Sequence, residues 1–184
     1  MNDRRNTCGQ AYGLTVMTPI LEGHESALAH YLSTLGTGSA SPLASVSGTH
    51  FARWVVIGDV VYEGGRQRPE HLRVGRLLFT SNFDGLPEPY LEELRTGLGE
   101  VADQVWTHCA GYPGCADADA DAFAAYMRSH QIESSLFFAA YDERTVGDVQ
   151  RSLVTRRRMI EFAVRAQELT PGELQAAFRE TFAR

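Results

Sequence analysis

With 184 residues, 43% of them hydrophobic and 22% charged, the chain has the size and composition of one globular domain. Its formal net charge of −6 argues against binding to nucleic acid or to an anionic membrane, because both depend on clustered Lys and Arg. The same charge favours a small, neutral or cationic partner. No segment approaches the roughly 20 consecutive apolar residues that span a bilayer, and residues 1–6 lack the apolar run of a signal peptide, so we expect a cytoplasmic protein.

The first half of the chain predicts a strand, a helix and a long hairpin. Residues 12–18 alternate Tyr, Leu and Val with small or polar residues before Pro19, which is typical of a strand. Residues 22–35 carry apolar side chains at helical spacing and end in a Gly-rich stretch. Segments 49–62 and 72–83 are rich in β-branched and aromatic residues and flank a polar break, so they predict two antiparallel strands.

The second half predicts a long helix, an insertion and a fourth strand. Residues 91–105 carry Leu and Val on one helical face. Residues 110–132 form a predicted insertion, in which a Gly- and Asp-rich loop leads into a short helix at 123–130. The compact apolar segment 134–141 predicts a strand.

Two capping patterns indicate helices near the C-terminus. Thr145 and Asp148 have the spacing of a capping box. Thr170 precedes Pro171, as an N-cap residue precedes a proline at the first helical position. We therefore expect two helices after the fourth strand.

The order of these elements, β-α-β-β-α-β, predicts a ferredoxin-like α+β fold in which helices cover one face of an antiparallel sheet. We expect a single domain over residues 1–184, with a core at about 12–165 and a C-terminal helical extension at 166–184. The opposite face of the sheet is left open. An uncovered apolar face must be buried by a ligand or by a second copy, so we expect the functional site there, and a homodimer.

Alternation along the second strand separates its side chains into two sets. His50 and Trp54 share one side and Phe51 and Arg53 the other, so His50 and Arg53 cannot share a face without a bulge. If Phe51 packs under the helices, the open face receives a set that resembles a pocket wall. The members of that set are His50, Trp54, Arg76, Leu78, Thr80 and Asn82.

The residues of this strand have a functional and a structural interpretation. His50 beside an indole and an arginine is suited to acid–base catalysis, to binding a metal or haem iron, or to holding an anionic substrate. The alternative is a hydrogen-bonded strand residue, with Trp54 as a dimer contact. For Arg53, which this alternation turns toward the helices, we expect a tie to Asp84 or to helix-end carbonyls; the alternative is substrate binding.

A second candidate site follows the predicted long helix, at residues 106–114. It combines Trp106, His108, Cys109 and Tyr112 with flexible glycines, and a capping role for this loop is the alternative. Cys109 there lacks the positive field that activates a thiol at a helix N-terminus, which argues against a nucleophile. The three cysteines show no C-x-x-C spacing, so neither a disulfide framework nor a cysteine zinc site is indicated.

Three segments, at residues 49–54, 77–85 and 111–113, resemble an uncharacterised bacterial family with a dimeric α+β barrel fold, and the resemblance covers residues 12 to about 165. The superfamily includes dye-decolourising peroxidases, chlorite dismutases, aldoxime dehydratases and cofactor-free monooxygenases. The resemblance implies a ligand site between the open sheet face and the helices or the partner subunit. It carries no catalytic motif, so it does not choose the reaction.

The sequence thus predicts a small-molecule oxidoreductase with haem as a candidate cofactor. In this hypothesis His50 is the iron ligand or the acid–base catalyst, and Arg53 and Asn82 polarise the substrate. His108 is a second candidate iron ligand and His130 a third. One alternative is a cofactor-free monooxygenase, cyclase or isomerase with His50 as base, and another is a non-catalytic dimeric ligand-binding module. The expected substrate-binding residues are Trp54, Arg76, Thr80, Trp106 and Tyr112.

Overall fold

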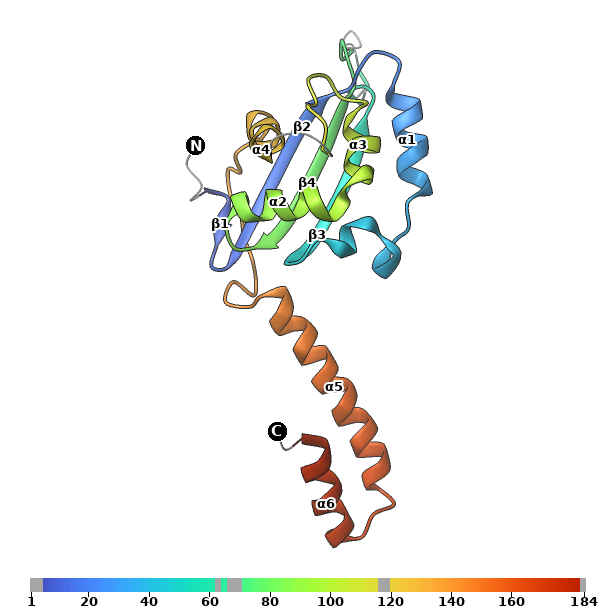
Figure 1. Ribbon diagram of the computed structural model, residues 1–184, viewed down its shortest axis with the longest axis vertical. Coiled ribbons are helices and arrows are strands. Elements are labelled where there is room, and N and C mark those ends of the chain that lie inside the picture. Colours follow the sequence, from blue (N-terminus) through green and yellow to red (C-terminus); the bar gives the residue numbers. More distant parts are fainter. Residues whose placement is uncertain (1–4, 62–63, 66–70, 116–119, 183–184) are drawn as a thin grey trace. The chain divides into compact units, whose positions relative to one another are not determined.

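The computed structural model describes residues 5–61, 64–65, 71–115 and 120–182 (Figure 1). The chain divides into two compact units, Met1–Glu143 and Arg144–Arg184. Among the described residues, the first unit holds the sheet and four α-helices, and the second holds two helices. The boundary therefore precedes the helical extension that the sequence predicted at 166–184.

The first unit is built on a four-stranded antiparallel sheet, which confirms the α+β class. Its strands are β1 (Thr7–Cys8), β2 (Ala11–Pro19), β3 (Thr49–Ile57) and β4 (Arg76–Asp84). They are arranged in the order β1-β2-β4-β3, and every pair of neighbours is antiparallel. The hairpin predicted from the β-branched segments is therefore confirmed as β3 and β4.

The predicted fourth strand at residues 134–141 is wrong. The edge beside β2 is paired instead with the N-terminal segment, where Gly13 N donates to Asn6 O at 2.8 Å. Further along the same edge, Val16 forms an isolated bridge with Gln131. Because these pairings occupy the edge of β2, the later segment does not join the sheet, and the order β-α-β-β-α-β is not completed.

Four helices cover one face of this sheet, and Figure 1 shows α2 and α3 lying across the strands. Their bounds are α1 (Glu25–Thr34), α2 (Pro87–Leu98), α3 (Glu100–Trp106) and α4 (Ala120–Ser129), and two short 3-10 turns at Gly38–Ala40 and Pro42–Ser45 precede β3. The single helix predicted at 91–105 is broken at Gly99, whose φ of 50° belongs to the left-handed region that favours glycine.

The core lies between the sheet and these helices. Alternate residues of β2 and β4 point into it, and each of the four helices adds buried side chains. Its largest fully buried side chains include Trp106, Tyr12, Phe79, Phe83, Phe123, Leu14, Leu77, Leu91 and Leu94. The other side of the sheet carries no such helical layer among the described residues, and we call it the open face.

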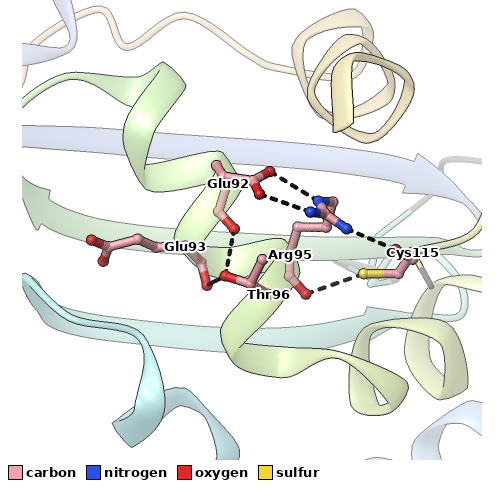
Figure 2. Close-up of polar contacts among 5 residues, drawn as sticks. All are labelled: Glu92, Glu93, Arg95, Thr96 and Cys115. Carbon is pink, nitrogen blue, oxygen red and sulfur yellow. Dashed lines mark hydrogen bonds and ion pairs between the residues drawn. The ribbon is translucent and has the colours of Figure 1, made fainter. Parts of the chain in front are cut away.

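The end of the loop after α3 is fastened to α2 by Arg95 (Figure 2). Its guanidinium pairs with both oxygens of Glu92 at 2.7 and 2.9 Å and donates to the Cys115 carbonyl at 3.0 Å. The Cys115 thiol in turn donates a hydrogen bond to the Arg95 carbonyl at 3.2 Å. This reciprocal pair fixes Cys115 against α2, within the core on the helical side of the sheet.

The second unit consists of α5 (Val146–Ala166) and α6 (Pro171–Phe182). The predicted capping box is confirmed, because Thr145 Oγ1 accepts from Asp148 N and the Asp148 carboxylate accepts from Thr145 N. No residue of either helix is buried. No helix in the described part of the chain is long and apolar enough to cross a membrane.

Candidate functional site

The register of β3 against β4 decides which side chains reach the open face. Phe51 pairs with Asn82, and Arg53 pairs with Thr80. Alternation along β4 buries Phe79 under the helices and leaves Thr80 and Asn82 on the open face, as predicted. Phe51 and Arg53 therefore lie on the open face as well, which is the reverse of the prediction for β3.

A β-bulge at His50 causes this reversal. The register shifts between Thr49 and Phe51, so one extra residue enters β3 and the alternation changes phase. His50 Nε2 lies 2.8 Å from Asp84 Oδ1, and the two side chains are only 21% and 18% exposed. Asp84 follows Asn82 by two residues in β4, so the bulge brings His50 to the same face as Arg53.

Arg53 is exposed, and its expected tie to Asp84 is wrong. Its Nε donates to Thr80 Oγ1 at 3.2 Å, whereas the Asp84 carboxylate pairs with His50. The two terminal nitrogens of Arg53 make no further hydrogen bond or ion pair with the residues that the structure describes. A guanidinium whose two terminal nitrogens form a free donor edge is suited to binding a carboxylate or a similar anion.

These side chains surround a cavity of about 500 Å³ on the open face. Residues 134–137 cross the face and form one wall, since a Cβ at Gly13 would lie only 2.8 Å from the Phe137 ring. Phe51, which is 77% exposed, forms part of another wall. The described lining residues are Gly13, Leu14, Thr15, Phe51, Ala52, Arg53, Thr80, Asn82, Ser134 and Phe137, of which Arg53 is the charged one.

The remaining residues predicted to bind substrate do not line this cavity. Arg76 begins β4 and its Nη1 lies 3.5 Å from the carbonyl oxygens of Val74 and Gly75. Trp106 is fully buried on the helical side of the sheet. Tyr112 donates to Asp103 Oδ1 at 2.9 Å in the same layer, where burial raises the pKa of its phenol. The predicted site is therefore divided by the sheet.

Trp54 also belongs to the helical side, because the bulge reverses its orientation. Its ring lies 5.6 Å from that of Phe79 and 6.1 Å from that of Trp106. It lines a second, smaller hollow of about 280 Å³ between β3 and residues 32–43. The indole nitrogens of Trp54 and Trp106 are buried without a hydrogen-bond partner among the described residues.

The loop after α3 holds the second pair of histidines. His108 Nδ1 lies 3.1 Å from His24 Nδ1, and burial, together with the nearby His24, lowers the pKa of His108. The adjacent Cys109 is buried, which raises the pKa of its thiol. Its sulfur accepts a hydrogen bond from the Thr18 hydroxyl at 3.2 Å. Sequence reasoning missed His24 because 84 residues separate it from its partner and no spacing signal joins them.

The described residues do not fit a haem in the open-face cavity. Neither His50 nor His108, the expected iron ligands, is among the residues that line it. His130, the third candidate, lies against Tyr126 at the end of α4, with Nδ1 2.9 Å from a backbone oxygen. We therefore derive no chemical step through haem.

Comparisons with known proteins add no assignment. No family model matches the chain, and no curated protein or solved structure is similar to it at a significant level. The resemblance to a dimeric α+β barrel family stays a prediction.

Proposed function

We propose that the chain is a cytoplasmic enzyme that works without a bound cofactor on a small acidic aromatic molecule held on the open face. The observation that carries this proposal is the unpaired edge of Arg53 inside a cavity walled by Phe51 and Phe137. The guanidinium supplies the charge for an anionic group, and the two phenyl rings supply apolar contact for an aromatic ring. The reaction class is that of cofactor-free monooxygenases, cyclases and isomerases.

His50 adjoins the lining residue Phe51 at the bulge but does not itself line the cavity, and in this proposal it supplies the base, together with Asp84, for the part of the substrate that extends beyond the lining. If His50 Nε2 carries the proton and donates to the Asp84 carboxylate, Nδ1 is left unprotonated and able to accept a proton. The first step is transfer of a proton from an acidic C–H of the substrate to His50 Nδ1. The electron pair of that bond remains on the substrate as an enolate, which Arg53 stabilises by its charge. An isomerase completes the cycle by returning the proton to another atom.

Binding of an anionic aromatic probe tests the role of Arg53. We expect anilinonaphthalene sulfonate to bind the wild-type protein, and Arg53→Gln to weaken binding about tenfold or more, which corresponds to one charge-assisted bond of roughly 1.5–3 kcal/mol. Arg76→Gln is the matched control, because Arg76 lies in the same strand pair but outside the cavity. Fluorescence titration gives both affinities, and circular dichroism verifies that each variant is folded.

Two results would count against the binding proposal. Equal losses of affinity in Arg53→Gln and Arg76→Gln would show that only general surface charge attracts the probe. Unchanged affinity in Arg53→Gln would place the probe elsewhere.

The haem-dependent oxidoreductase is tested on the same preparation. A Soret band that grows when haemin is added and is lost in His50→Ala would replace the cofactor-free proposal.

A second candidate, the dimeric ligand-binding module, is favoured by the second unit. Its α5 exposes an apolar stripe that includes Val149, Leu153, Ile160 and Val164, between 42% and 66% exposed. Two helices alone cannot enclose a core, so a second copy packing on this stripe would complete a four-helix bundle.

Light scattering tests this assembly. We expect it to give the mass of a dimer for the wild-type chain and the mass of a monomer for the double variant Leu153→Glu, Ile160→Glu. A wild-type monomer would exclude this assembly.

A further inference from the structure

The two histidines His24 and His108 meet where the start of α1 lies beside the end of α3, outside the open-face cavity. His24 precedes α1, and His108 follows α3. Backbone bonds fix their positions, since Leu21 N donates to the His108 carbonyl at 2.8 Å and His24 N donates to the Leu21 carbonyl at 3.0 Å. A bridge between Ile20 and Cys109 joins the same two segments. The imidazoles are thus held together by the fold, and their contact does not depend on flexible linkers.

The contact itself admits two chemical interpretations. The Nδ1 atoms are 3.1 Å apart, and the ring planes meet at 71° with centroids 5.2 Å apart. One ring can donate N–H to the other, or both can direct lone pairs at a shared cation. For an ion at ~2.05 Å from each nitrogen, the N–ion–N angle would be about 98°. This angle lies between the values of octahedral and tetrahedral coordination, about 90° and about 109°.

We propose that His24 and His108 bind a divalent first-row transition ion, Zn²⁺, Ni²⁺ or Cu²⁺, through their Nδ1 atoms. Neutral imidazole is a favoured ligand for these ions, and the spacing of the two nitrogens is that of neighbouring positions on one ion. His24 is exposed and His108 half-buried, so water can fill the remaining positions. With two protein ligands among the described residues, the ion exchanges readily and differs from a closed structural zinc.

The place of the two rings in the fold supports the same assignment, because His24 precedes α1 and His108 follows α3. An ion on both rings also links the start of α1 to the end of α3. Because the unfolded chain does not hold the two rings together, binding stabilises the folded protein.

Titration of the full chain with ZnCl2, NiCl2 or CuCl2 tests this site. We expect the imidazole signals of His24 and His108 to shift or broaden first in nuclear magnetic resonance spectra, and the midpoint of thermal unfolding to rise with metal concentration. Each of His24→Gln and His108→Gln should weaken binding at least tenfold in calorimetry and remove the thermal shift. His30→Gln is the matched control, because His30 lies on α1 outside the pair, and it should bind as the wild type does.

Other outcomes would overturn the proposal. If none of the three ions shifts the two imidazole signals at a tenfold excess, the pair is a hydrogen bond and no metal site exists. If His24→Gln binds metal as tightly as the wild type, the ion lies elsewhere. His24 is exposed, so its replacement is a test that does not depend on refolding the core, and a loss of binding in His30→Gln would equally contradict the assignment.

Discussion

Replacing Trp106 by alanine should lower the free energy of unfolding by about 3–5 kcal/mol. Trp106 is fully buried, and its ring lies between 5.5 and 6.4 Å from four other aromatic rings. Truncation would remove the largest buried side chain and leave a cavity that rigid neighbours cannot fill. The loss would identify Trp106 as the centre of the core, not as a wall of the ligand site.

Urea unfolding followed by circular dichroism measures this loss. Phe51→Ala is the control, because an exposed side chain should change stability by less than about 0.5 kcal/mol. An alanine variant of Trp106 that kept its stability but lost binding of the aromatic probe would contradict the structure and return Trp106 to the site.

Replacing His50 by alanine should abolish proton abstraction, with a loss of about 10²–10⁴-fold in rate. Phenylpyruvate is a suitable probe, because it combines an aromatic ring, a carboxylate and an acidic C–H. We expect the wild-type protein to accelerate uptake of deuterium from D2O at that carbon. His50 accepts the proton through Nδ1 while its Nε2 is held by Asp84, so the variant retains the binding site but lacks the base.

Two further variants separate catalysis from structure. Asp84→Asn should retain part of the activity, because the amide can hold the imidazole but does not stabilise its charged form. His130→Gln should be as active as the wild type, since the ring of His130 packs against Tyr126 at the end of α4. Equal deuterium uptake by the wild type and His50→Ala, or none by the wild type, would remove His50 as the base.

The sequence predicted correctly those helix starts and strand ends that depend on a few neighbouring residues. The capping box at Thr145 and the strand that ends at Pro19 were visible because a few neighbouring residues define them. Segment 134–141 has the composition of a strand, yet Asn6 and the short β1 occupy the edge that it would need. Competition for an edge between distant segments leaves no pattern in either one.

The faces of the β4 side chains were predicted correctly, whereas those of Arg53 and Trp54 in β3 were predicted wrongly. Thr80 and Asn82 were assigned correctly because β4 alternates without interruption. One bulge at His50 exchanged the faces of Trp54 and Arg53, and no residue type in the segment signals a bulge. The prediction of Trp106 as a substrate-binding residue was wrong because aromatic side chains occur both in cores and in ligand sites.

The most direct test of the open-face site is to map the bound probe. Amide signals of the wild-type protein are followed by nuclear magnetic resonance while anilinonaphthalene sulfonate is added. We expect the largest changes at residues 13–15, 51–53, 80–82 and 134–137, and we expect Arg53→Gln to abolish them at the same probe concentration. Changes centred on Trp106 and Tyr112, or on α5 and α6, would contradict it.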